Sequence, residues 1–256
     1  MNSLLLFKNN LRVKDNPVLF YGSESGNVLP VYIYDDINTN KKMGSSSKYW
    51  LHRALESLNN SLGGNLMCFK GETISVIDKL IKDYSINEIY CEEPFLKNDV
   101  ILFKKLKEHL KKTKIRLISF NCTLLWEPYL VLKSDSSPYK VFTPFYKKGC
   151  LGNLIPPPPL GDVNSINFSE FNNNTKIEDL QLLDSFNWFG KFDDLWDVSE
   201  NSALNIFDSF LDKSIYNYKE GRDFPSLNFN SKLSPYIRFG MISVNRMWYE
   251  VNKLKF

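Results

Sequence analysis

The chain has 256 residues, of which 43% are hydrophobic and 24% are charged. This composition excludes a disordered polymer, and the length allows one large domain or two modest ones. The net charge of +3 gives only weak support for a nucleic-acid partner, because many slightly basic proteins bind none.

The spacing of the cysteines and the hydropathy of the chain limit which metal or redox sites the protein can hold and where in the cell it works. The four cysteines match no zinc or redox motif and only two histidines accompany them, so we predict free thiols and no metal site. The apolar run Leu4–Phe7 is too short for a signal peptide, and no later run is long enough to span a membrane. We therefore expect a cytoplasmic protein without membrane contact.

The first half of the chain alternates short apolar runs with amphipathic segments. This pattern predicts an α/β fold with a doubly wound, five-stranded parallel sheet of the Rossmann-like type. The expected strands are Leu4–Phe7, Val28–Tyr34, Leu66–Lys70, Glu88–Cys91 and Arg116–Phe120. The expected helices are Val18–Tyr21 after an Asp15-Asn16-Pro17 cap, Lys48–Leu62 after a Ser45–Ser47 cap, Glu72–Asp83 and Asn98–Thr113.

The second half of the chain does not continue this alternation of apolar runs and amphipathic segments. On physical grounds the aromatic and basic segment Tyr139–Gly149 is expected to be a loop, and the proline run that follows it marks a linker. We expect three parts: an α/β domain at 1–150, a linker at 151–187, and the start of an all-α domain at 188–256. A helix is predicted over Ser202–Tyr218.

A late stretch combines a helix start with polar residues. Ser234 before Pro235 has the pattern of a helix N-cap and first helical residue. Asn230, Ser231 and Lys232 precede it, so an amide, a hydroxyl and a cation would lie beside unpaired backbone N–H groups. These groups could bind an anion. The alternative is an ordinary capped helix after a loop.

Four strings in this chain resemble the DNA photolyase and cryptochrome family. In the late region they are Tyr-Lys-Glu-Gly-Arg-Asp-Phe-Pro at 218–225 and Asn-Ser-Lys-Leu-Ser-Pro-Tyr-Ile-Arg-Phe-Gly at 230–240. In the first half they are Leu-Phe-Lys-Asn-Asn-Leu-Arg at 6–12, followed by Asp-Asn-Pro, and Tyr-Lys-Val-Phe-Thr-Pro-Phe at 139–145. The chain departs from the family at Lys8, Asn10, Asn230 and Lys232, where arginine, aspartate, threonine and arginine are usual.

The resemblance implies two cofactors and a DNA contact. FAD would be held by Tyr218, Asn230, Ser231, Lys232, Leu233 and Ser234, and Arg222 would contact damaged DNA. An antenna chromophore, methenyltetrahydrofolate or a deazaflavin, would lie near the α/β domain. Glu93 and Pro94 follow the fourth strand where such a pocket could form, although an ordinary loop is the favoured interpretation of them. No catalytic side chain is assigned.

The resemblance also implies an activity. It indicates a deoxyribodipyrimidine photo-lyase, an enzyme that repairs cyclobutane pyrimidine dimers in DNA by light-driven, flavin-mediated electron transfer. The alternatives are a cryptochrome-like blue-light photoreceptor without repair activity and an inactive α/β fragment that binds a nucleotide or folate. Because the family's flavin domain continues beyond the position matching Phe256, we expect an incomplete copy, monomeric, with an apolar face left open.

Overall fold

A computed structural model describes residues 1–24, 26–38, 42–152, 155–170, 175–183, 186–224 and 226–254. Its centre is a five-stranded sheet in the order β3-β2-β1-β4-β5, with every neighbouring pair parallel. The strands are β1 (Asn2–Phe7), β2 (Asn27–Tyr34), β3 (Met67–Lys70), β4 (Glu88–Glu92) and β5 (Arg116–Phe120). The predicted doubly wound α/β sheet is confirmed.

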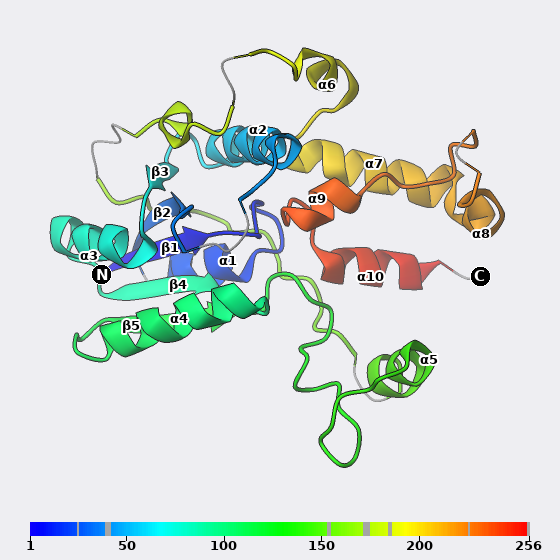
Figure 1. Cartoon of the computed structure of the whole chain (residues 1–256), viewed down its shortest axis with the longest axis horizontal. Helices are drawn as coiled ribbons and strands as arrows, with labels where there is room; N and C mark the ends of the chain where they lie inside the picture. The colour runs from blue at the N-terminus through cyan, green and yellow to red at the C-terminus, as the bar shows by residue number, and fades with distance from the viewer. Residues whose placement is uncertain are drawn as a thin grey trace.

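Helices cover both faces of this sheet, as Figure 1 shows. They are α1 (Pro17–Glu24), α2 (Ser45–Ser61), α3 (Thr73–Tyr84) and α4 (Lys97–Leu110). Side chains alternate along β1, so Leu5 joins the apolar cluster under α1 and α2, while Leu4 joins the cluster under α3 and α4. The central strands are buried on both sides, which explains their continuous apolar sequences.

The helix starts test the predicted caps. The Asn16 side chain accepts hydrogen bonds from the backbone N–H groups of Val18 (3.1 Å) and Leu19 (3.4 Å), as the cap pattern predicts. The prediction for α2 was wrong, because Gly44 is the N-cap and the three serines form the first helical turn. Serine hydroxyls are tolerated in a first turn, where backbone N–H groups are still unpaired.

The expected loop at Tyr139–Gly149 is largely helical. It contains α5 (Phe142–Pro144) and the π-helical turn η1 (Phe145–Cys150), and Figure 1 shows α5 lying away from the sheet. Phe142 and Tyr146 stack at a centroid distance of 5.7 Å, as residues four apart on a helix can. The segment is therefore helical where its composition predicted a loop.

The segment between the two halves is attached to the sheet. Phe168 forms a parallel bridge with Val28 at the start of β2, where the shorter β3 provides no partner. Further along, a 3-10 turn, η2 (Ile177–Leu180), lies against β3 and α2. The division into domains at residues 150 and 187 stays a prediction.

All the regular elements described after residue 188 are helical. They are α6 (Gly190–Leu195), α7 (Glu200–Lys213), η3 (Ile215–Asn217), α8 (Tyr218–Gly221), α9 (Ser234–Arg238) and α10 (Val244–Lys253). The predicted single helix to Tyr218 was wrong, because α7 ends at Lys213 and the next residue, Ser214, turns to bond the Asn228 carbonyl at 3.2 Å. The 14-residue helix α7 is followed by two short helical turns, η3 and α8.

Candidate functional site

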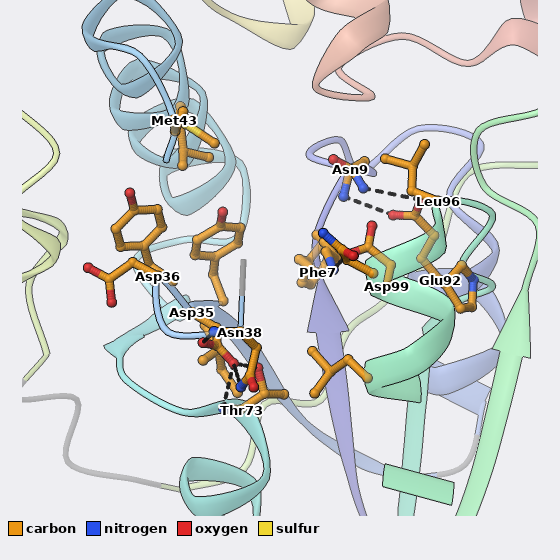
Figure 2. A pocket seen from close by; sticks show the side chains of 18 of the residues that line it. Phe7, Asn9, Asp35, Asp36, Asn38, Met43, Thr73, Glu92, Leu96 and Asp99 are labelled. Atoms are coloured by element: carbon orange, nitrogen blue, oxygen red, sulfur yellow. Dashed lines mark hydrogen bonds and ion pairs between the residues drawn. The ribbon is translucent and has the colours of Figure 1, made fainter. Parts of the chain in front are cut away.

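A cavity of about 780 Å³ opens at the carboxyl ends of β1, β2 and β4. The strand order reverses between β1 and β4, because the chain runs from β1 outward to β3 and returns on the other side as β4. Ligands of open α/β sheets bind in the crevice at such a reversal. Figure 2 shows side chains of two walls on either side of this cavity.

One wall is organised by Asp35, at the end of β2. Its carboxylate accepts hydrogen bonds from the Thr73 N–H (3.0 Å) and hydroxyl (2.8 Å) and from the Asn38 side chain (2.8 Å). Burial alone would raise the pKa of Asp35, but the hydrogen bonds from Asn38 and Thr73 outweigh it and hold the pKa below its usual value. This wall therefore carries a carboxylate that is held in place by α3 and by the loop after β2.

The opposite wall joins three distant segments. Glu92, at the end of β4, accepts hydrogen bonds from the Asn9 backbone N–H (2.8 Å) and side-chain amide (3.4 Å), and burial raises its pKa. Lys8 pairs with Asp99 at 2.6 Å. Arg238, at the end of α9, donates to the Asn9 side chain at 3.0 Å. Charges of both signs thus line this side of the cavity.

The sequence predicted only some of the residues in this second wall of the cavity. Of the two residues after β4 that it considered, Pro94 lines the cavity. Glu93 is turned toward β5, where it accepts a hydrogen bond from the Ser119 hydroxyl. Lys8 and Asn9 were missed, although polar residues directly after a buried strand were a usable signal. Arg238 had no local signal, because only the folded chain brings it to β1.

The second candidate site is the region around α8 and the loop at 228–233. The Asn230 side chain donates to the Arg222 carbonyl oxygen at 3.3 Å. A Cβ atom on Gly221 would lie only 2.2 Å from the Phe229 ring, so a glycine permits this close packing. The structure thus brings the helix carrying Tyr218 and Arg222 against the start of the polar loop.

The backbone of the polar loop has an unusual turn. Lys232 has a left-handed φ of 55°, and Leu233 follows in the right-handed region with φ −82° and ψ −9°. Successive residues of opposite hand direct backbone N–H groups into an anion-binding concavity. Leu233 is buried and anchors the loop, whereas Asn230, Lys232 and Ser234 are exposed.

The predicted N-cap role of Ser234 was wrong. Leu233 occupies the N-cap position of α9, no side chain caps the helix, and Pro235 is the second helical residue. The left-handed turn at Lys232 shifts the helix start by one position. Ser234 remains at the head of the helix, with its side chain exposed.

Tyr218 begins α8, and Arg222 directly follows its last residue. The Tyr218 residue is 40% exposed, and its ring contacts the edge of Phe210 at 5.8 Å between centroids. The Arg222 side chain is 55% exposed and forms a loose ion pair with Asp223 at 3.4 Å. Both side chains are therefore accessible to a ligand.

The two regions are connected by α9, a helix of five residues. It begins at Ser234, directly after the polar loop, and Arg238 at its end reaches the wall of the cavity. Of the residues described, no helix is both long and apolar enough to cross a membrane.

Comparison with known proteins places this geometry in a family. The model of the DNA photolyase family matches residues 3–161. A deoxyribodipyrimidine photo-lyase of Agrobacterium fabrum is 30% identical over 98% of this chain and 53% of its own length, and cryptochrome-2 of Arabidopsis thaliana is 26% identical over 96% of this chain and 42% of its own length. The chain thus spans about half the length of the curated relatives it matches.

Solved structures of photolyases resemble this chain over nearly its whole length. The crystal structure of a bacterial class III photolyase from Agrobacterium tumefaciens superposes with a TM-score of 0.88 at 29% identity, over 97% of this chain and 52% of that one. An archaeal photolyase from Sulfolobus tokodaii shares the fold, with a TM-score of 0.78 at 19% identity, over 100% of this chain and 56% of that one. From the family match and these likenesses, the chain belongs to the DNA photolyase family.

Proposed function

We propose that this chain binds FAD at α8 and the polar loop and serves the light-driven repair of cyclobutane pyrimidine dimers in DNA. The observation that carries the proposal is the left-handed turn at Lys232 beside Ser231, because a turn of this kind can direct backbone N–H groups to a diphosphate and a hydroxyl and a cation stand next to it. Left-handed non-glycine residues are uncommon and cluster at ligand sites. Bound FAD would supply the electron for the repair.

Each residue of the loop has a distinct part in this proposal. Ser231 would donate its hydroxyl to the diphosphate, and Lys232 would neutralise its charge without the two-pronged contact that an arginine makes. Asn230 holds the loop against α8 through its bond to the Arg222 carbonyl. Leu233 is buried in the core cluster and anchors the loop there. The exposed Tyr218 would provide an aromatic contact to the same ligand.

Arg222 would contact the phosphate backbone of the damaged DNA. Its side chain is more than half exposed, and its pairing with Asp223 at 3.4 Å is loose enough to be exchanged for a phosphate. A contact of this kind releases counterions, so the affinity for DNA would fall as salt rises. An Arg222→Gln variant would bind more weakly and with a shallower salt dependence.

The cavity above the sheet is our candidate for the antenna chromophore, methenyltetrahydrofolate or a deazaflavin. Its volume of about 780 Å³ lies within the range of cofactor pockets, and Tyr32, Tyr34 and Phe103 line it together with the charged walls. The archaeal photolyase from Sulfolobus tokodaii was solved with two FAD molecules, which implied a novel light-harvesting cofactor, so a second chromophore has a precedent on this fold.

The flavin proposal is tested by adding FAD to the purified chain and measuring retained flavin absorption after gel filtration. We expect Ser231→Ala and Tyr218→Ala each to weaken FAD binding by about tenfold or more, as the loss of one charge-assisted hydrogen bond or one aromatic contact would. Ser226→Ala, at an exposed position of the same segment, is the matched control and should bind as the parent does. A parent chain that retains no flavin would refute the proposal.

A cryptochrome-like photoreceptor is the second candidate. It is favoured by the 26% identity with cryptochrome-2 over 96% of this chain. Both candidates require the same flavin, so FAD binding does not separate them. An assay of the repair of dimer-containing DNA under blue light separates the two candidates, since a photoreceptor without repair activity leaves the dimers intact.

A further inference from the structure

Three potential metal ligands meet where α2 faces the segment between the two halves. His52 and Glu56 come from α2, and Glu178 comes from η2. Each offers one ligand atom, and these three atoms all lie within 4.8 Å of one another. The group lies outside both candidate cofactor sites, since none of the three residues lines the cavity or belongs to the polar loop.

Helix geometry sets two of the three ligands. His52 and Glu56 are four residues apart, so they occupy the same face of α2. The His52 Nε2 and Glu56 Oε1 atoms are 3.4 Å apart, which is long for a hydrogen bond. It matches the separation of about 3.3 Å between two ligand atoms of a tetrahedral ion with bonds of about 2.0–2.1 Å.

The His52 ring is buried and its hydrogen-bonding capacity is only half used. The residue is 4% exposed, and its Nδ1 atom is buried without a hydrogen bond. A buried imidazole ordinarily pairs both ring nitrogens. In the described part of the chain, the polar contact of the ring is the one between its Nε2 atom and Glu56. Nε2 is therefore the ring nitrogen that faces the proposed site.

The two oxygens of Glu56 face different neighbours. Arg53 donates to its Oε2 atom at 2.9 Å and is itself held by Asp193, to which it donates twice at 2.9 Å. The other oxygen, Oε1, is turned to His52 and lies 3.4 Å from its Nε2 atom.

Glu178 is brought to the group by its own segment. Leu180 of η2 is fully buried in the core, and the Thr175 hydroxyl accepts a hydrogen bond from the Cys68 N–H at 3.0 Å. Within the described part of the chain, the Glu178 carboxylate has no hydrogen bond or ion pair of its own. After burial, its charge is the second cause that raises the pKa of the Cys68 thiol to about 12. The Glu178 carboxylate thus stands within 4.8 Å of the ligand atoms of His52 and Glu56.

We propose that His52, Glu56 and Glu178 bind one divalent transition-metal ion of the zinc class, which fastens the segment around η2 to α2. An imidazole nitrogen with two carboxylate oxygens suits Zn²⁺ better than Mg²⁺ or Ca²⁺, which prefer oxygen ligands alone. The ion would offset the repulsion between the two carboxylates. Glu56 is partly exposed and Glu178 exposed, so the ion can enter from solvent and water can complete the coordination.

The test is metal titration of the untagged, chelator-treated chain. We expect one equivalent of Co²⁺ to give a visible absorption band that Zn²⁺ displaces, and calorimetry to give one Zn²⁺ per chain. Glu178→Gln and Glu56→Gln should each weaken Zn²⁺ binding by about 10- to 100-fold. Because Glu178 is exposed, its substitution leaves the fold intact, as circular dichroism would verify.

The second histidine of the chain is the matched control. His109 lies on α4 and pairs with Asp78 at 2.8 Å, so His109→Gln removes the other imidazole without touching the proposed site. It should bind Zn²⁺ as the parent does. The proposal is overturned if the parent binds no stoichiometric Zn²⁺, if Glu178→Gln binds as tightly as the parent, or if His109→Gln abolishes binding. None of these readouts involves flavin or repair.

Discussion

At the scale of single residues, Gly240 determines how closely the second half of the chain approaches β1. It has a left-handed φ of 65°, and a Cβ atom there would lie 1.8 Å from the Asn9 carbonyl oxygen. The buried Arg12 guanidinium donates to the Gly240 carbonyl at 3.0 Å, and the Leu11 N–H donates to the Phe239 carbonyl at 3.1 Å. Both hydrogen bonds require the backbone at residues 239–240 to lie against the segment that follows β1.

We expect Gly240→Ala to lower the free energy of unfolding by about 3 kcal/mol or more, because left-handed strain of about 1–2 kcal/mol adds to the displacement of a backbone. Urea unfolding measures this change. Gly64→Ala is the matched control, since Gly64 also has a positive φ of 83° but an added Cβ would meet nothing within 4 Å. Equal losses in the two variants would contradict the role given to close approach.

At the scale of elements, Asp35 joins the end of β2 to the start of α3 through its bonds to Thr73. Its pKa is lowered in the folded chain, so the ionised carboxylate stabilises the fold above the unfolded pKa of about 4, and this stabilisation is lost as the pH falls through the lowered value. We expect Asp35→Asn to be less stable than the parent at pH 7, with a difference that shrinks below about pH 4. Unfolding midpoints measured against pH would show this convergence.

The neighbouring Asp36→Asn variant is the control for this effect, because Asp36 accepts none of these hydrogen bonds from Thr73 or Asn38. Its stability should follow the parent at every pH. A constant difference between Asp35→Asn and the parent across the acid range would indicate lost packing rather than a lost charge.

The elements also show where sequence patterns succeed. The predicted β5 has the bounds that the structure has, because a short apolar run between turns has few alternatives in a parallel sheet. The end of α7 was misjudged, because the apolar stripe continues past Lys213, whereas there the helix gives way to the turn η3 and the Ser214 hydroxyl bonds the distant Asn228 carbonyl. Local periodicity carries no information on such a partner.

At the scale of the whole molecule, aromatic contacts join the α/β half to the helical half. Trp50 of α2 meets the rings of Trp196 and Tyr236 edge to face, at centroid distances of 5.3 and 5.0 Å. Trp50 and Tyr236 are buried, and all three belong to or pack against one core cluster that spans both halves. The two halves should therefore unfold together.

We expect one cooperative transition, with tryptophan fluorescence and circular dichroism giving the same midpoint. Trp50→Ala should cost about 3–5 kcal/mol through the cavity it leaves. Phe142→Ala is the control, because Phe142 is 73% exposed and its loss should change the unfolding free energy by no more than about 0.5 kcal/mol. Two separate transitions in the parent chain would show that the halves are energetically independent.

The sequence by itself determined the parallel sheet, the order of its elements and the polar composition of the late loop, because hydrophobic spacing and short motifs are local properties. Only the tertiary structure decided that Arg238 reaches the cavity beside β1, that Lys232 turns left-handed ahead of α9, and that Glu178 meets His52 and Glu56. Those relations depend on contacts between residues far apart in the chain, and the packing of one half against the other sets them.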